Sequence, residues 1–390
     1  MISVEIALDQ LFALVSPGAE EEVPLAEAGQ RVLARSATTS LTQPPFAASA
    51  MDGYAVAASR VAPGARFRVI GEAAAGHGFD GLVAEDYAVR IFTGAPLPEG
   101  TDRVVIQEDV TREDDIITLK DALDEAAYVR PAGADFEAGM RLDAPRLLGP
   151  SDIALLAAMN IARVPVVARP KVALLATGDE LVMPGEIPGP DQIIASNSFG
   201  LKALVESLGA TARLLPIARD NEASLRMAFE LAADADLIVT IGGASVGDHD
   251  LVGPVAETMG LQRSFYKIAM RPGKPLMAGR MGDAAMIGLP GNPVSAMVCG
   301  HVFLAPVIRA MLGLATCAAP RYQAQLGADL AANGPREHYM RAILNGDTVT
   351  AQPRQDSALL SVLAASNALL IRPVGDGPRR AGETVEYIPL

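Results

Sequence analysis

The chain has 390 residues, half of them apolar, and a formal net charge of −14 at pH 7. This length exceeds one ordinary domain and predicts two to four, while the apolar content excludes a disordered chain. The acidic balance argues against nucleic-acid binding. The two cysteines are too few for a disulfide framework and the N-terminus lacks a signal-peptide pattern, so we expect a soluble cytoplasmic protein.

The N-terminal segment predicts a helix, because Ser3 can cap it and apolar side chains recur at helical spacing from Leu8 to Val15. A second helix is predicted to open at Pro150. Between the two, residues 43–143 carry short alternating runs punctuated by Gly and Pro, which are typical of a β-rich unit with long loops. We therefore expect this unit to be inserted into a helical domain made from both flanks.

Residues 171–314 alternate strand-like and helix-like segments. This rhythm predicts a doubly wound, mostly parallel sheet with helices on both faces, in which ligands bind beyond the carboxyl ends of the strands. The apolar run from Val294 to Ala315 is long enough to be tested as a membrane span. Because it contains His301 and Arg309 and follows a turn, we expect a buried helix and no membrane partner.

From Pro320 onward, short β runs with frequent Gly and Pro predict a small barrel or sandwich. The fold class is thus a multidomain α/β protein organised around the doubly wound sheet. The predicted domains are a helical N-terminal domain at residues 1–42 plus 144–168, an inserted β-rich domain at 43–143, a doubly wound domain at 169–317 and a C-terminal β barrel at 318–390.

Acidic side chains follow three strands of the predicted sheet. They are Glu180 beside Asp179, then Asp220, then Asp250 beside Asp248. Because the ends of these strands meet at one edge of the sheet, the acids should converge, and their mutual repulsion would drive each toward protonation. A divalent cation would remove that cost, and Asp248 and Asp250 can hold a hard metal ion. The cations Lys267, Arg271 and Lys274 with a bound anion would also remove it. The alternative is that these acids are separate helix N-caps.

Glycine turns near the same strand ends predict an anion site. The strand that ends at Gly242-Gly243 exposes backbone N–H groups to a ligand. The turn of residues 288–295 begins the apolar helix, whose first N–H groups and Ser295 can also hold an anion, although an ordinary helix start is the alternative. Cations on nearby loops can hold an oxyanion; they are Lys267, Arg271 and Lys274. This combination suits a phosphate-bearing substrate with Mg²⁺.

Four polar positions of the β-rich unit stand in turn-forming motifs, and they are Asp52, Thr93, Arg130 and Asp135. Taken alone, Asp52 is explained by a β-turn and Thr93 by a Pro-rich connection. A surface salt bridge is the corresponding explanation for Arg130 and Asp135.

Taken together, these motifs resemble the molybdopterin molybdenumtransferase family, called MoeA in bacteria and present as the E domain of gephyrin-like proteins. The resemblance covers essentially the whole chain. It rests on six motifs in the same order, at residues 49–56, 93–98, 177–181, 242–250, 272–275 and 288–295. It implies four domains in an elongated homodimer, with the active cleft between the doubly wound domain of one subunit and the inserted domain of the other.

The resemblance also implies the reaction, in which molybdate is inserted into the dithiolene of adenylylated molybdopterin with release of AMP and a requirement for Mg²⁺. The resemblance implies the catalytic candidates Asp52, Thr93, Glu180, Asp250, Lys267 and Lys274. The candidate Mg²⁺ ligands are Glu180, Asp220 and Asp250. The substrate-binding candidates are Arg130, Asp135, Asp220, Gly242, Gly243, Ser245, Arg271, Pro275, Gly291, Asn292 and Ser295. Further expected partners are the molybdopterin adenylyltransferase and molybdoenzyme chaperones.

Two positions depart from the family pattern. Arg271 stands where many members carry Lys, which keeps the charge but changes the donor geometry. The Gly-containing C-terminal loop is altered around Gln355-Asp356-Ser357, so no role is assigned to Ser357 or Arg341. Two other functions stay open, namely a molybdopterin adenylyltransferase, which shares this kind of doubly wound domain, and a non-catalytic dimeric scaffold.

Overall fold

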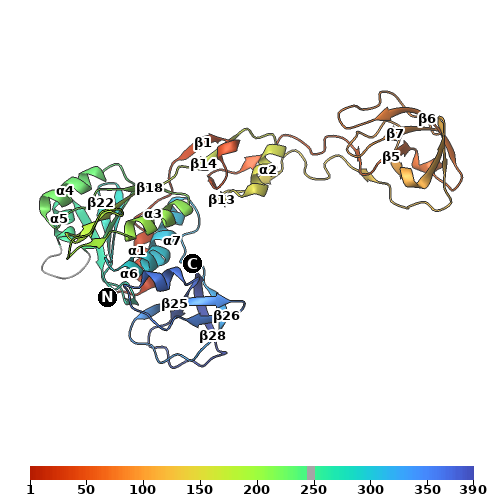
Figure 1. The fold of residues 1–390 in the computed structure, drawn as a ribbon. Helices are drawn as coiled ribbons and strands as arrows, with labels where there is room; N and C mark the ends of the chain where they lie inside the picture. Colours follow the sequence, from red (N-terminus) through yellow and green to blue (C-terminus); the bar gives the residue numbers. More distant parts are fainter. Residues whose placement is uncertain (244–250) are drawn as a thin grey trace.

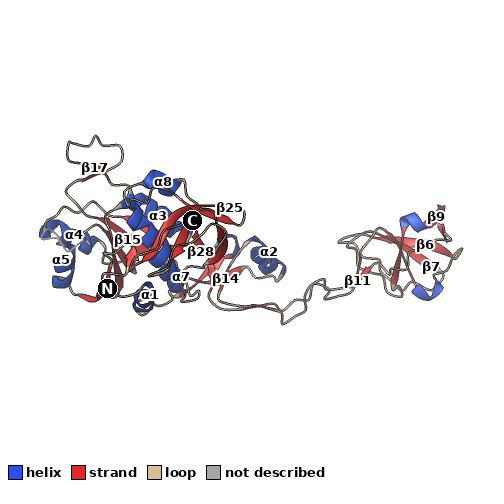
Figure 2. Ribbon diagram, turned by 90° about the horizontal axis from the view of Figure 1, so that it is seen from below, coloured by secondary structure: helices blue, strands red, loops and turns tan. Residues whose placement is uncertain are grey.

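The molecule is elongated in this computed structural model, which describes residues 1–243 and 251–390 (Figure 1). The doubly wound domain and the C-terminal barrel lie together at one end. A small sheet with α2 (Pro150–Ala158) lies in the middle, and the inserted β-rich domain forms the far end. Figure 2 shows the same arrangement after a quarter turn, with extended connections leading to the inserted domain.

The first helix, α1 (Val4–Phe12), begins as predicted, because the Ser3 hydroxyl accepts the backbone N–H of Ile6 at 3.2 Å. Its buried face joins the same hydrophobic core as the central strands of the doubly wound domain. The apolar stripe therefore docks α1 on that domain, in a core that Val32 and Val167 of the middle sheet also join.

The middle region, predicted to be helical, contains α2 but also a four-stranded antiparallel sheet. In the order β1-β14-β2-β13, its strands are Glu20–Pro24, Arg163–Val167, Val32–Leu33 and Arg146–Leu147. The first of these reads Glu-Glu-Glu-Val-Pro and buries only Val23, so its sequence carries almost no hydrophobic alternation. β1 is part of the sheet because it pairs with the apolar strand β14.

The inserted domain is a six-stranded sheet in the order β8-β5-β7-β6-β10-β9. Side chains on alternate positions form two separate hydrophobic clusters, so both faces of the sheet are covered. Its strands are β5 (Gly53–Val56), β6 (Arg66–Ala73), β7 (Tyr87–Ile91), β8 (Arg103–Ile106), β9 (Val110–Glu113) and β10 (Ile116–Leu119). Short pairs lie at its entrance, β4 (Ala48–Ser49) with β11 (Val129–Arg130) and β3 (Ala37–Thr38) with β12 (Arg141–Leu142).

The doubly wound sheet has the order β18-β15-β19-β23-β22-β20. The first four strands are parallel, β22 runs antiparallel to β23, and β20 runs antiparallel to β22 and so in the same direction as the first four. The mostly parallel sheet that the sequence predicts is thereby confirmed. The strands are β15 (Lys171–Ala176), β18 (Thr211–Leu214), β19 (Leu237–Ile241), β20 (Leu261–Tyr266), β22 (Met277–Met281) and β23 (Ala284–Leu289). β19 is buried at every position, as expected for a central parallel strand.

Helices cover both faces of this sheet. The side chains of α4 (Glu222–Leu231) and α5 (Val252–Thr258) join one core, and those of α1 and α3 (Asn197–Ser207) join the other. The apolar run forms α6 (Pro293–Cys299), a π-helical turn (Gly300–Leu304) and α7 (Ala305–Met311). Among the described residues this continuous helix has the length and apolarity of a membrane span, yet 83% of its apolar window is buried in the fold, as the sequence predicts.

The C-terminal domain is a closed barrel, because β27 pairs with both β28 and β25. Its strands are β24 (Tyr322–Leu326), β25 (Glu337–Asn345), β26 (Thr348–Ala351), β27 (Ala368–Arg372) and β28 (Thr384–Pro389), with α8 (Leu360–Ala364) between β26 and β27. β21 (Met270–Arg271) leaves the doubly wound domain and pairs with β25, so the two domains share a sheet edge as well as a core.

Candidate functional site

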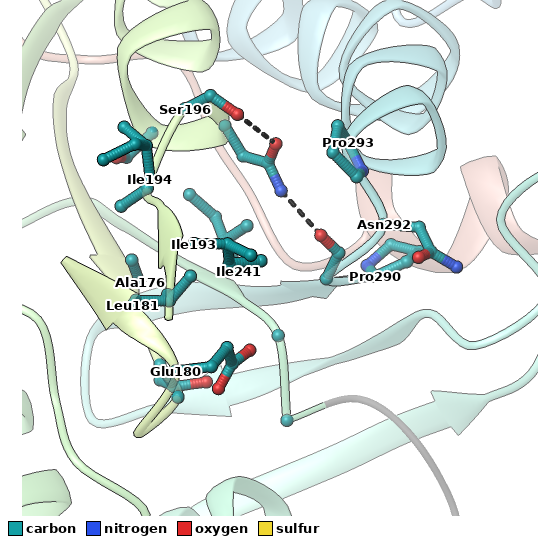
Figure 3. Close-up of a pocket in the computed structure, with 18 of the residues that line it drawn as sticks. Ala176, Glu180, Leu181, Ile193, Ile194, Ser196, Ile241, Pro290, Asn292 and Pro293 are labelled. Carbon is teal, nitrogen blue, oxygen red and sulfur yellow. Dashed lines mark hydrogen bonds between the residues drawn. The ribbon is translucent and has the colours of Figure 1, made fainter. Parts of the chain in front are cut away.

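A cavity of about 760 Å³ lies at the carboxyl ends of β15, β19 and β23, where the doubly wound topology places a ligand site (Figure 3). One wall is apolar, built by Leu181, Ile193 and Ile241. The wall opposite is the turn before α6. Of the residues predicted from sequence, those that line this cavity are Glu180, Asp220, Gly242, Gly243, Pro275, Gly291 and Asn292.

The floor of the cavity is the glycine pair after β19. Gly242 and Gly243 have φ of +95° and +60°, which side-chain-bearing residues rarely adopt. A Cβ on Gly242 would lie 2.8 Å from the carbonyl oxygen of Thr177, and one on Gly243 would overlap the side chain of Val252. Packing and backbone conformation therefore both require glycine here, and the pair lets a ligand approach the main chain.

Two of the three predicted carboxylates reach the cavity, Glu180 from the turn after β15 and Asp220 from the turn after β18. Asp220 is held by a reciprocal arrangement, in which its backbone N–H donates to Asp179 Oδ1 at 3.2 Å and the Asp179 N–H donates to Asp220 Oδ2 at 3.4 Å. The third carboxylate, Asp250, lies outside the described residues, as do Asp248 and Ser245. Within residues 1–243 and 251–390, no three acidic, histidine or cysteine side chains gather as a metal site.

The turn before α6 is held by a side chain from the neighbouring helix. The Asn197 amide donates to the carbonyl oxygen of Gly291 at 2.7 Å and accepts from the Ser196 hydroxyl at 3.4 Å (Figure 3). Asn292 precedes the helix without capping it through its side chain. Ser295 is one turn further on, is 4% exposed and does not line the cavity.

The predicted cations gather on the segment that leads to the barrel. Arg271 and Lys274 are exposed, and the Lys267 ammonium lies 5.2 Å from the centre of the Tyr266 ring. In the β21–β25 pairing, Arg271 stands directly opposite His338. Burial and the charges of the surrounding arginines, Arg271 first among them, lower the pKa of His338 to about 4, so this imidazole is neutral at pH 7.

Arg341, three residues further along β25, has a buried guanidinium at this junction. It is 0% exposed, and its Nε and Nη1 groups have no hydrogen-bond partner among the described residues. Its Nη2 donates to the carbonyl oxygens of Asp356 at 2.9 Å and Arg354 at 3.4 Å. A buried guanidinium with N–H groups left over is costly unless an anion completes it.

The segment of residues 354–358 connects Arg341 to the cavity. Ala358 lines the cavity, and the carbonyl oxygen of Ser357 accepts the backbone N–H of Val294 in the first turn of α6 at 3.0 Å. This segment therefore links the cation cluster (Arg271, His338, Arg341 and their neighbour Arg336) to the wall of the cavity, at the junction of two domains.

Four predicted residues lie elsewhere, in or at the entrance of the inserted domain: Asp52, Thr93, Arg130 and Asp135 (Figure 1). Asp52 and Thr93 are in contact, since the Thr93 N–H and hydroxyl both donate to Asp52 Oδ1 at 2.8 Å. The backbone bond and then the hydroxyl bond lower the pKa of the Asp52 carboxyl. In a single chain these residues are far from the cavity.

Sequence reasoning missed Asn197, and it left Arg341 without a role. Asn197 stands at the start of a predicted helix, where it resembles an ordinary capping residue. Arg341 stands in a strand of unremarkable alternation, and in the fold its side chain is buried and bonded to the 354–358 segment. The apolar residues on both sides of this arginine are a local signal for a buried position.

Comparison with known proteins agrees with this architecture. Residues 2–160 match the model of the MoeA N-terminal region (domains I and II), 173–310 a probable molybdopterin binding domain, and 323–390 the MoeA C-terminal region (domain IV). Proteins named molybdopterin molybdenumtransferase from Haemophilus influenzae and Nostoc are 36% and 34% identical, over 99% and 100% of this chain and 98% and 94% of their own. A crystal structure of the molybdopterin biosynthesis MoeA protein from Pyrococcus horikoshii superposes with a TM-score of 0.85 at 27% identity, covering 99% of both chains.

The fold and site thus define an enzyme of molybdenum cofactor biosynthesis with a ligand cavity at the strand ends of a doubly wound domain. The chain belongs to the MoeA family of molybdopterin molybdenumtransferases.

Proposed function

We propose that the protein inserts molybdate into adenylylated molybdopterin, with release of AMP and a requirement for Mg²⁺. The observation that carries this proposal is the juxtaposition of two sites. A cavity with two carboxylates and a glycine floor adjoins a cluster of cations that includes a buried, incompletely bonded guanidinium. The first suits an adenylylated phosphate ester, and the second suits a tetrahedral oxyanion.

The cavity supplies binding and orientation. Its apolar wall of Leu181, Ile193 and Ile241 offers a surface on which a flat heterocycle can pack. The glycine floor leaves room for a phosphate to approach the main chain, where backbone N–H groups can donate to it. Asn197 donates a hydrogen bond to the Gly291 carbonyl oxygen, which fixes the wall opposite.

Glu180 and Asp220 would hold the magnesium ion. Two carboxylates beside an open cavity fit this ion, which usually takes one or two carboxylates together with substrate phosphate oxygens. When bound, Mg²⁺ neutralises charge that develops on the phosphoanhydride. The chain's own contribution is to hold both carboxylates at the same strand edge, and the Asp179–Asp220 hydrogen bonds keep one of them in place.

Molybdate would be held by the cation cluster. The Nε and Nη1 groups of Arg341 have no partner in the part of the chain that the structure describes, so they can donate to oxyanion oxygens. Arg271 adds positive charge from the neighbouring strand. His338 is neutral and so adds no charge of its own. Catalysis in this arrangement is positional and electrostatic. The buried thiol of Cys299, whose pKa is raised by desolvation, is unsuited to nucleophilic attack.

We further propose that the working unit is a homodimer, in which Asp52 and Thr93 of one copy face the cavity of the other. Two facts support this arrangement: the pair is exposed and preorganised by two hydrogen bonds, and the inserted domain extends far from its own cavity. The ionised Asp52 carboxylate would orient substrate or water from across the interface.

Incubation of the purified protein with adenylylated molybdopterin, molybdate and Mg²⁺ tests the proposal. Release of AMP that depends on molybdate is expected. Consumption of ATP with free molybdopterin would instead favour the adenylyltransferase alternative, and a dimer without either turnover would favour a scaffold.

A further inference from the structure

The side chain of Gln355 is bonded to the main chain of Arg341. Its Oε1 accepts the Arg341 backbone N–H at 3.0 Å, and its Nε2 donates to the Arg341 carbonyl oxygen at 2.9 Å and to the Gln352 carbonyl oxygen at 2.8 Å. A carboxamide has the same donor and acceptor arrangement as a peptide group. The Gln355 side chain therefore bonds to the Arg341 main chain in the way that the backbone of a neighbouring strand would.

The Gln355 carboxamide takes the place of a strand peptide group at the point where β26 leaves the barrel. The β25–β26 pairing ends at Ala342 with Ala351, and the Gln352 N–H makes one more bond to the Arg341 carbonyl at 2.8 Å. Beyond that point the main chain turns toward α6, so the backbone N–H of Arg341 loses its strand partner. The Gln355 amide satisfies that N–H and lets the chain depart without an orphaned group.

The departing chain sets the geometry around the guanidinium. Carbonyl oxygens on either side of Gln355, those of Arg354 and Asp356, accept from Arg341 Nη2, and the next carbonyl, of Ser357, accepts the Val294 N–H of α6. One side chain thus fixes the backbone of Arg341, the loop that holds its Nη2, and the wall residue Ala358. With Nη2 occupied, the groups left for an anion are Nε and Nη1.

We propose that Gln355 is a positioning residue for oxyanion binding: it holds the 354–358 segment so that Arg341 presents Nε and Nη1 to molybdate beside the cavity. The inference rests on the proposed function, because it assigns molybdate to Arg341. Gln355 itself touches no substrate. Its effect should therefore pass entirely through Arg341.

A double-mutant cycle measures that dependence. The variants are Gln355→Met, which keeps the length but removes all three hydrogen bonds, Arg341→Met, and the pair. We expect Gln355→Met to raise the KM for molybdate about tenfold while changing the KM for adenylylated molybdopterin by less than about twofold. In the Arg341→Met background the same change should have almost no further effect. An equal effect in both backgrounds, or none in the wild type, would overturn the proposal.

Gln325→Met is the matched control, because Gln325 is an exposed amide on β24 of the same barrel and contacts only Thr384 at 3.5 Å among the side-chain bonds of the described residues. It should leave both KM values unchanged. Direct titration of each variant with molybdate separates the two claims. If the wild type binds molybdate and Gln355→Met does not weaken it, the positioning role is wrong. If the wild type binds molybdate but releases no AMP, the proposed function is wrong. The molybdate affinities of the four proteins in the double-mutant cycle then still test the positioning role of Gln355.

Discussion

Thr93 donates both its backbone N–H and its hydroxyl to one oxygen of Asp52, each at 2.8 Å. The two bonds favour the ionised carboxylate and lower the pKa of Asp52, so the group stays charged below its ordinary titration range. Both residues are on the domain most distant from the cavity of their own chain. Their preorganisation is useful to the reaction only if a second copy brings them to a cavity.

Mixing two inactive variants tests this arrangement. One chain carries Asp52→Ala and the other Glu180→Ala, and each alone should be nearly inactive. In a mixed dimer one cleft would combine an intact cavity with an intact Asp52, so equal mixing with free exchange should restore about a quarter of wild-type AMP release. A mixture no more active than its parts, although exchange is verified by mass spectrometry, would refute the shared cleft.

The glycine floor should tolerate no side chain. Gly243→Ala is expected to abolish binding of adenylylated molybdopterin, because a Cβ there meets both an unfavourable φ of +60° and the side chain of Val252. Gly282→Ala is a close control, since Gly282 has the same φ of +60° in the same domain but no atom within 4 Å of the added Cβ. It should cost about 1 kcal/mol of stability and leave binding intact. Equal binding by the two variants would contradict the assigned floor.

The neutral His338 predicts a specific loss of stability in mild acid. Its folded pKa of about 4 is below the usual 6.5, so the unfolded chain binds the extra proton first as the pH falls. The contribution of the neutral imidazole to the free energy of unfolding is fully present above pH 6.5 and is lost as the pH falls toward 4. The total loss is at most about 3 kcal/mol.

Urea unfolding of wild type and His338→Gln at pH 7 and pH 4.5 measures this loss. Other acid-sensitive groups affect both proteins alike, so the difference between them isolates the histidine. The wild type should lose more stability than the variant on acidification. Parallel losses would show that burial and the surrounding arginines do not lower the pKa of His338 in the folded protein.

A buried ion-pair network should stabilise the barrel. Asp376 binds Arg372 at 2.6 Å and Arg379 at 2.9 Å, and the side chains of Asp376 and Arg372 are only 9% and 3% exposed. Asp376→Ala leaves Arg372 charged and buried, so we expect a loss of about 3 kcal/mol in the free energy of unfolding. Asp86→Ala removes an exposed pair with Arg60 and should cost less than about 1 kcal/mol. Similar losses in thermal unfolding of the two variants would contradict this assignment.

The doubly wound sheet and the barrel were predictable because their strands carry strong hydrophobic patterns and clear Gly and Pro punctuation. The glycine floor and Glu180 were predictable for the same reason, since topology alone brings strand ends together. The middle sheet was not predictable, because β1 (Glu-Glu-Glu-Val-Pro) has no hydrophobic alternation and joins the sheet through its pairing with β14. The role of Arg341 was also out of reach, because its burial and its bonds to the 354–358 segment depend on tertiary packing, which no local pattern encodes.

Anomalous diffraction tests the central claim most directly. A crystal of the protein soaked with adenylylated molybdopterin and molybdate, measured at the molybdenum absorption edge, should show a single molybdenum peak between the Arg341 guanidinium and the Gly291–Asn292 turn, with the pterin in the cavity floored by Gly242 and Gly243. A molybdenum peak on another face of the molecule, or a pterin bound away from these strand ends, would contradict the account.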